Sequence, residues 1–265
     1  MREYSPLILT CFAKWDVESG VFDTTLEQAH TLNISALAAS STHVFSGSRD
    51  YSVKAWDLAT KTCTSEFSCP RNIVTALAYS PSAQLLFQGS EDLCVRAWDV
   101  RSSHGSAPSL QLGGYVYFPL CLALQAGEQL LATGCKGFNG VGCGVVLWDV
   151  RKPSAPLAQL AGHSQDVVSC VFSPARSGLL LTASKDGSVL AWDAAAPART
   201  AQLQLGSRKL LSGLCAMSAA EQSFAAAAMD GSLTLFRCAA PQAEEMQVLF
   251  ETDEAAAAAA AQMHS

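Results

Sequence analysis

Apolar and polar residues alternate along most of this chain in short runs that are separated by turn residues. The clearest run is 182–193, in which the alternation passes through the dipeptide Asp186-Gly187 and ends at Trp192-Asp193. A period of two that is interrupted by Asp-Gly predicts a β-hairpin. Because similar runs recur along the chain, the sequence predicts an all-β protein.

Trp-Asp dipeptides mark the end of each repeat. All five tryptophans are followed by Asp, and the intervals between them are 41, 42, 50 and 44 residues. A degenerate sixth copy ends at Phe236-Arg237, another 44 residues along the chain. A period of about 40 to 45 residues with Trp-Asp at the end of a strand is typical of a four-stranded propeller blade. The chain therefore resembles the WD40 repeat family.

The resemblance implies a WD40 β-propeller with five near-complete blades. We expect a single propeller domain over 1–251, in which 1–28 form a partial first blade, and a flexible alanine-rich tail over 252–265. WD40 rings most often have seven blades, so we expect a truncated seven-bladed type that lacks N-terminal blades. A smaller closed ring is the alternative.

The alternation also places individual strands. In the second copy we expect strands at 34–38, 44–48 and 63–67, and at the end of the chain an outer strand at 246–250. The fourth copy differs, because a strand at 130–133 leads into a glycine-rich insertion before Trp148-Asp149. This insertion explains the interval of 50 residues.

Composition limits the function. The chain has a net charge of −6 and a pI near 5.3, which argues against binding to nucleic acid phosphates. Its ten cysteines include no C-x2-C pair, so a zinc or redox motif is disfavoured and most should be reduced and buried in strands. Neither a signal segment nor a run of about 18 apolar residues is found. We expect a cytoplasmic protein without a cofactor.

The WD40 resemblance also implies a buried hydrogen-bonded network in each blade. It joins a His, a hydroxyl residue, an Asp and the Trp, and a fully bonded network of this kind fixes one packing arrangement. Thr182 or Ser184 is the expected hydroxyl in the fifth blade, and Ser46 or Ser48 in the second. The other network residues expected in these two blades are His163, Asp186, Trp192, His30, Asp50 and Trp56.

A hydrolase is the alternative interpretation of a His-Asp-Ser set. Recurrence of the set with the repeat favours a structural role, because catalysis needs one exposed nucleophile. The other blades lack the His, which is replaced by Pro70, Tyr115 and Gly206. We expect those blades to be less rigid.

Partner binding on propellers is commonest on the face that carries the tight turns. The glycines of the insertion do not predict a phosphate loop, because a strand and not a helix follows them. We interpret the insertion as a flexible rim loop with Phe138 as a candidate partner contact. The other candidate contacts are exposed turn and loop residues of types common at interfaces: Arg49, Arg71, Glu91, Tyr117, Asp166 and Lys185.

A narrower resemblance rests on the insertion. Residues 137–143 and 145–151, followed by Gly162-His163, are similar to those of ciliary WD40 proteins. This resemblance implies a non-catalytic scaffold in cilium assembly or intraflagellar transport, at the cilium or its base, with Elmo-domain GTPase-activating proteins and ciliary transport components as partners. A general WD40 adaptor, such as a ubiquitin-ligase substrate receptor, is the alternative.

Overall fold

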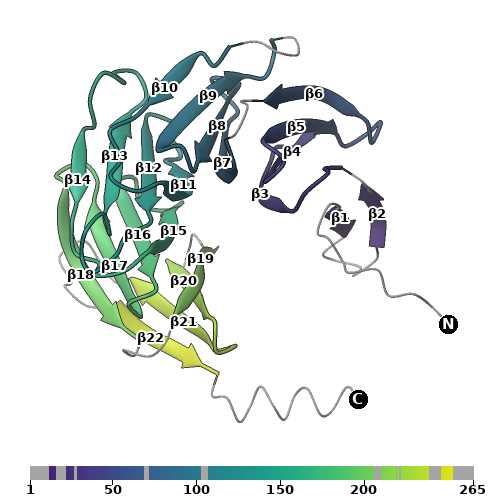
Figure 1. Ribbon diagram of the computed structural model, residues 1–265. Helices are drawn as coiled ribbons and strands as arrows, with labels where there is room; N and C mark the ends of the chain where they lie inside the picture. Colours follow the sequence, from purple (N-terminus) through teal and green to yellow (C-terminus); the bar gives the residue numbers. More distant parts are fainter. Residues whose placement is uncertain are drawn as a thin grey trace. The chain divides into compact units, whose positions relative to one another are not determined.

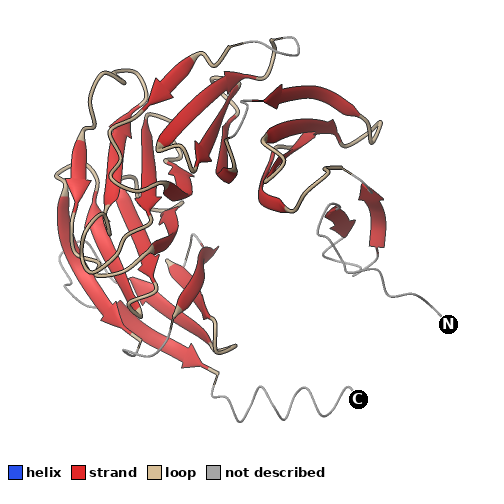
Figure 2. Ribbon diagram, in the orientation of Figure 1, coloured by secondary structure: helices blue, strands red, loops and turns tan. Residues whose placement is uncertain are grey.

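The computed structural model describes residues 12–15, 22–26, 29–68, 72–102, 107–205, 210–218, 220, 222–238 and 246–252. Every regular element within these ranges is a β-strand (Figure 2). The all-β prediction is therefore confirmed.

The chain divides into two compact units, Met1–Gly113 and Gly114–Ser265, and Figure 1 labels the strands of both. The first unit holds one two-stranded and two four-stranded antiparallel sheets. The sheets, in chain order, are β1 (Phe12–Trp15) with β2 (Phe22–Leu26); β3 (Ile34–Ala39), β4 (His43–Ser48), β5 (Ser52–Asp57) and β6 (Cys63–Ser68); and β7 (Val74–Ser80), β8 (Leu85–Ser90), β9 (Cys94–Asp99) and β10 (Leu110–Leu112).

The second unit holds three four-stranded antiparallel sheets, each with its strands in chain order. They are β11 (Pro119–Leu124), β12 (Leu130–Cys135), β13 (Val145–Asp149) and β14 (Ala158–Leu160); β15 (Val167–Phe172), β16 (Leu179–Ser184), β17 (Ser188–Asp193) and β18 (Ala198–Gln204); and β19 (Leu211–Ser218), β20 (Ser223–Ala228), β21 (Leu233–Cys238) and β22 (Met246–Glu251).

Neighbouring sheets of a unit pack face to face, and the first strand of each sheet lies against the first strand of the next. In the second unit β11 lies against β15, and β15 lies against β19. Leu147, Leu180 and Trp192 belong to the core between the first two of these sheets, and Leu181 and Phe224 to the core between the next two. Each sheet therefore covers the apolar face of the next, which is why one repeat alone cannot bury its core.

The observed strands agree with the predicted ones within a residue or two. The predicted strand at 130–133 extends to Cys135, and the outer strand at 246–250 extends to Glu251. Five four-stranded sheets confirm the five near-complete blades. The single domain over 1–251 and the truncated seven-bladed ring stay predictions. Of the predicted tail only Thr252 is described, and it hydrogen-bonds to Leu233 of β21; 253–265 lie outside the described residues.

The expectation of buried cysteines is only partly met. Cys135, Cys143, Cys170 and Cys238 are buried, but Cys63 and Cys215 are exposed although both lie in strands. The reason is the period of two in a strand, which turns alternate side chains away from the core.

Candidate functional site

The sheet β15–β18 holds a hydrogen-bonded network around His163. His163 Nδ1 lies 3.2 Å from Asp186 Oδ2, and its Nε2 lies 2.8 Å from Thr182 Oγ1. Trp192 Nε1 donates to the same Thr182 oxygen over 2.9 Å. Ser188 donates to the other carboxylate oxygen of Asp186. The structure thus brings together the three residues expected in this blade and selects Thr182, not Ser184, as the hydroxyl.

The sheet β3–β6 repeats the arrangement. His30 Nδ1 lies 3.0 Å from Asp50 Oδ2, and His30 Nε2 lies 2.7 Å from Ser46 Oγ. Trp56 Nε1 donates to Ser46 Oγ over 2.9 Å, and Ser52 donates to Asp50. Here Ser46 supplies the hydroxyl.

The direction of the hydrogen bonds follows from the charge on the Asp. Burial alone would raise the pKa of the Asp186 carboxyl, but the hydrogen bonds from His163 and Ser188 outweigh it and hold that pKa well below its usual range. An ionised Asp186 only accepts, so His163 Nδ1 donates to it and Nε2 accepts from Thr182. Thr182 in turn accepts from Trp192, so the ring nitrogens of His163, the Thr182 hydroxyl and the Trp192 N–H of this network all have hydrogen-bond partners.

In the first-unit network, hydrogen bonds likewise keep the Asp ionised. Burial is the largest influence on Asp50 and would raise its pKa, but the hydrogen bonds from Ser52 and Thr31 lower it to about 2. Burial lowers the pKa of His30, although Asp50 opposes the change. The hydroxyl in the middle of each network is fully buried. These hydroxyls therefore fix packing, since a substrate has no route to them.

The sheet β11–β14 lacks the His but not the hydrogen bond. Tyr115, which lies where the repeat has His, accepts directly from Trp148 Nε1 over 2.8 Å, and its ring lies 6.0 Å from the indole. Thr133, at the place of Thr182, instead donates to the backbone oxygen of Val146. Tyr115 alone thus takes the place of the His-Thr pair as the partner of the indole, and the expected lower rigidity of this blade stays a prediction.

The sheet β7–β10 has a different replacement. Trp98 Nε1 donates to Gln88 Oε1 over 2.7 Å, and Gln88 donates onward to Ser90. The buried guanidinium of Arg96 pairs with Asp92 in the tight turn. The His position of this blade, Pro70, lies outside the described residues, as does Gly206 of the last blade. In that last blade Phe236 takes the place of Trp and stacks on Phe224 at 5.8 Å.

The glycine-rich insertion between β12 and β13 is an ordered hairpin, which corrects its interpretation as a flexible loop. Phe138 and Val141 exchange two backbone hydrogen bonds of 2.9 and 3.0 Å. Between them Asn139 and Gly140 have φ values of 49° and 79°. Two positive φ values define a type I′ turn, which Asn-Gly favours strongly.

Several contacts hold the hairpin to the rest of its unit, among them a backbone hydrogen bond from Gly140 N to Ser164 O of 3.2 Å. Asp166, in the loop before β15, accepts from Gly137 N over 3.0 Å and from Lys185 Nζ over 2.8 Å. Gly142 packs on the ring of Tyr117, and any Cβ at this position would overlap that ring. Burial alone would raise the pKa of Asp166, but the hydrogen bonds from Gly137 and Lys185 lower it. Asp166 therefore stays ionised and keeps the hairpin in place.

The hairpin presents apolar side chains to solvent. Phe138 is 69% exposed and Val141 is 56% exposed, and Val116 beside Tyr117 is 67% exposed. Phe138 lines an open hollow of about 710 Å³ together with Lys136, Gln165 and Lys185. We name this surface, formed by residues 136–144 and 161–166 with Lys185, the insertion rim.

Four of the seven predicted contact residues lie at the insertion rim or against it. They are Tyr117, Phe138, Asp166 and Lys185. Arg49 and Glu91 are exposed in tight turns of the first unit, and Arg71 lies outside the described residues. Sequence reasoning missed Val141, although the dipeptide Asn139-Gly140 signals a hairpin that exposes it.

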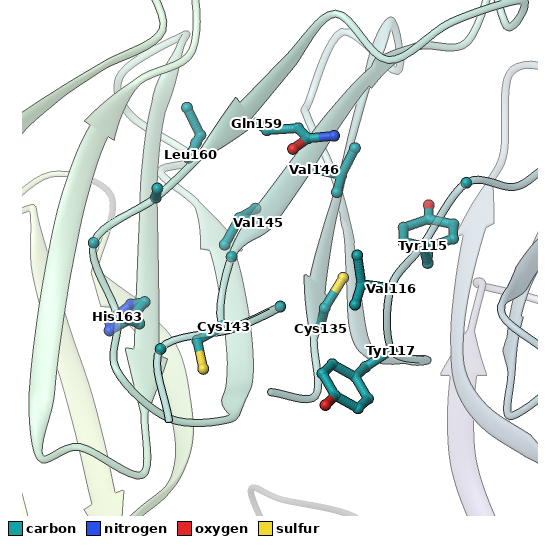
Figure 3. Close-up of a pocket in the computed structure, with 16 residues that line it drawn as sticks. Tyr115, Val116, Tyr117, Cys135, Cys143, Val145, Val146, Gln159, Leu160 and His163 are labelled. Carbon is teal, nitrogen blue, oxygen red and sulfur yellow. The ribbon is translucent and has the colours of Figure 1, made fainter. Parts of the chain in front are cut away.

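A second, smaller cavity of about 200 Å³ is lined in part by Gly140, Gly142 and Cys143 of the insertion (Figure 3). Tyr115, Tyr117, Cys135, Cys143 and His163 are among the side chains that line it. Burial raises the pKa of both thiols, that of Cys135 to about 12. Within the described ranges, no three His, Cys, Asp or Glu side chains are placed to hold a metal ion.

Comparison with known proteins decides the family of the repeats. Residues 21–57, 61–99 and 154–193 match the family model described as WD domain, G-beta repeat. These three segments are similar to WD40 repeats. Together with the five sheets, they make the fold an all-β WD40 propeller, in agreement with the prediction. WD40 repeats bind other proteins, and their commonest role is that of a scaffold.

Curated relatives are similar to part of the chain. A "Ribosome biogenesis protein WDR12 homolog" from Drosophila virilis is 31% identical over 164 residues, which cover 61% of this chain and 38% of that protein. A protein named "Non-functional target of rapamycin complex subunit LST8-2" from Arabidopsis thaliana is 32% identical over 169 residues, which cover 62% of this chain and 53% of that protein. The chain thus spans between about a third and a half of the length of these relatives.

Solved structures share the fold alone. A chain in the "Crystal Structure of Mitotic Checkpoint Complex" superposes with a TM-score of 0.80 at 19% identity, covering 92% of this chain and 74% of that one. The "Structure of U3-55K" superposes with a TM-score of 0.77 at 18% identity, covering 92% of this chain and 75% of that one. Across the described ranges, no helix has the length and apolar character that crossing a membrane requires.

Proposed function

We propose that this chain is a non-catalytic scaffold that binds another protein through the insertion rim. The observation that supports this most directly is the exposure of Phe138 and Val141 on an ordered hairpin. A large exposed apolar side chain held by a rigid support loses little conformational entropy when a partner covers it. Aromatic anchors of this type carry much of the binding energy at interfaces.

The expected contribution of Phe138 follows from its area. A Phe side chain that is 69% exposed offers on the order of 140 Å², which corresponds to about 3 kcal/mol when it is buried. Its removal should therefore weaken partner binding about 100-fold. Lys136 and Lys185 beside the hollow supply polar contacts around this apolar centre.

For the identity of the partners, one candidate is the ciliary machinery. The insertion resembles that of WD-repeat-containing protein thirty-one, which implies a regulator of cilium assembly or intraflagellar transport. We propose Elmo-domain GTPase-activating proteins and ciliary transport components as the partners in this case, and the cytoplasm at the ciliary base as the location. The support is the sequence of residues 137–151.

A second candidate is ribosome biogenesis, and a separate observation favours it. Several of the curated relatives carry the name "Ribosome biogenesis protein WDR12 homolog", including those from Drosophila virilis and Anopheles gambiae. The shared region is about a third of those proteins, so the similarity supports a common repeat surface. A general adaptor, for example in a ubiquitin ligase, is the remaining alternative.

Affinity purification of the tagged full chain from its native cells, followed by mass spectrometry, tests the proposal. The wild type is compared with Phe138→Ala and with Leu157→Ala. Leu157 is a matched control because it is also an apolar residue of the second unit, is 51% exposed, and lies directly before β14, whose other end leads into the insertion rim. We expect one set of partners to be lost in Phe138→Ala and kept in Leu157→Ala.

The recovered proteins then separate the candidates. Elmo-domain or intraflagellar transport proteins support the ciliary scaffold, and ribosome assembly factors support the second candidate. Ligase subunits indicate the general adaptor. If every partner binds Phe138→Ala as well as the wild type, the insertion rim is not the binding surface and the proposal is wrong.

A further inference from the structure

Two thiols meet between neighbouring sheets of the second unit. Cys121 on β11 and Cys170 on β15 are 49 residues apart in the chain, and their Sγ atoms are 3.4 Å apart. Cys170 is buried, while Cys121 is partly exposed. Both lie on the first strands of their sheets, where β11 packs against β15.

The Cys121 position holds a small residue other than Cys in the other four sheets. Cys121 pairs with Gly134 across β11 and β12, one residue after a β-bulge. The equivalent positions, identified by the same bulge and register, are Ala36, Ala76, Ser169 and Gly213.

The Cys170 position holds a larger apolar residue in the other four sheets. Cys170 pairs with Thr182, and the equivalent positions all carry leucine: Leu37, Leu77, Leu122 and Leu214. Leucine is therefore the residue that fills this core position elsewhere in the repeat, and core filling alone does not explain a cysteine at position 170. Both departures occur at the same junction, the only one in the described sheets where the two positions carry thiols that face each other.

Gly134 provides the space that the two sulfurs occupy. A Cβ on this glycine would lie 2.5 Å from Cys121 Sγ and 3.0 Å from Cys170 Sγ. At the equivalent Gly47 the same space is filled by Val74 and Leu77. The sulfurs therefore lie in contact in a space that a side chain on β12 would close.

We propose that Cys121 and Cys170 form a reversible disulfide when the protein meets a peroxide. Sulfurs at 3.4 Å need to approach by only about 1.4 Å to reach the bond length of about 2.05 Å, which rotation of the two side chains achieves. The product would covalently join β11 to β15, and so join the sheet that carries the hairpin to the sheet that carries Asp166.

The chemistry proceeds in two steps that balance. Cys121, as its thiolate, attacks one oxygen of hydrogen peroxide, the O–O bond breaks, and Cys121 becomes a sulfenic acid while the released hydroxide takes up the thiol proton as water. Cys170 then attacks the Cys121 sulfur, the S–O bond breaks, and the Cys170 proton leaves with the hydroxide as a second water. Two thiols are oxidised and one peroxide is reduced to two waters.

Their surroundings assign the two roles. Cys121 is the partly exposed thiol, so peroxide reaches it first. The hydrogen bond from Cys121 and burial both raise the pKa of Cys170. Cys170 therefore remains a protonated thiol until the sulfenic acid forms beside it, which suits a resolving cysteine.

Peptide mapping of the full chain tests the proposal. The reduced protein is treated with increasing hydrogen peroxide, the remaining thiols are alkylated, and a non-reduced tryptic digest is analysed by mass spectrometry. Cys121 and Cys135 lie in tryptic peptide 102–136, and Cys170 lies in 152–176. We expect these two peptides to become linked, with a loss of two hydrogens, and to separate on reduction.

Three variants identify the cysteines. Cys121→Ala and Cys170→Leu install residues that equivalent positions already carry, so both should fold, and both should lack the linked peptides. Cys135→Ala should keep them. Exposed Cys215 reports that peroxide has acted. The proposal is overturned if Cys215 is fully oxidised while 102–136 and 152–176 stay separate, or if Cys121→Ala still links them.

Discussion

The Thr182 hydroxyl joins His163 to Trp192 in the network of β15–β18. Its removal should therefore lower the free energy of unfolding by more than the loss of one ordinary hydrogen bond. Thr182→Val keeps the shape but leaves two fully buried groups without a partner: the N–H of Trp192 and the Nε2 lone pair of His163. An unsatisfied buried polar group costs about 1–3 kcal/mol. Two of them should lower the free energy of unfolding by about 3 kcal/mol, because the indole and imidazole are too confined to find other partners.

Thr133→Val is the matched control. Thr133 occupies the same place in β12, is equally buried, and makes one hydrogen bond, to the backbone oxygen of Val146. Its loss should cost about 1 kcal/mol. Urea denaturation followed by circular dichroism compares both variants with the wild type. The comparison is valid when the free energy of unfolding depends on urea concentration with the same slope in all three proteins. Equal losses in the two variants would refute the view that the His163 network stabilises the sheet beyond an ordinary hydrogen bond.

Two further predictions concern the other networks. Tyr115→Phe should lower the free energy of unfolding by about 1–3 kcal/mol, because it removes the acceptor of the Trp148 indole; a loss below about 0.5 kcal/mol in urea denaturation would show that the bond is unimportant. In acid, the folded pKa of His30 lies below 6.5 and that of Asp50 at about 2, below 3.8, so both stabilise the fold at neutral pH. Stability should fall as the pH drops below 6.5 and again from 3.8 towards 2, and Asp50→Asn should flatten the second fall; an unchanged acid limb in that variant would contradict this.

Much of the fold follows from local sequence. Alternation with a period of two, together with Trp-Asp at a regular interval, predicts the sheets because both are properties of single strands and turns. Asp186 belongs to the Asp-Gly turn itself and Trp192 follows Gly187 by five residues, so the repeat locates both, and the WD40 resemblance implies their place in the network. The β-bulges at the start of each first strand, such as that before Cys121, left no sequence signal.

The parts that could not be predicted depend on contacts between distant residues. Tyr115 reaches Trp148 across 33 residues, and only the folded sheet shows that a Tyr replaces a His and a Thr together. Cys121 and Cys170 belong to different sheets, so no spacing rule brings them together. The type I′ hairpin is the exception, because Asn139-Gly140 is a recognisable turn dipeptide.

If the chain is a scaffold of the proposed kind, a partner covers the insertion rim. Site-specific photo-crosslinking in native cells tests it most directly, with a benzophenone amino acid placed at Phe138 in one sample and at Leu157 in another. Both positions are exposed and apolar, and both lie in the second unit. We expect a discrete crosslinked partner from position 138 and none from position 157. No crosslink at 138, or the same product from both positions, would contradict it.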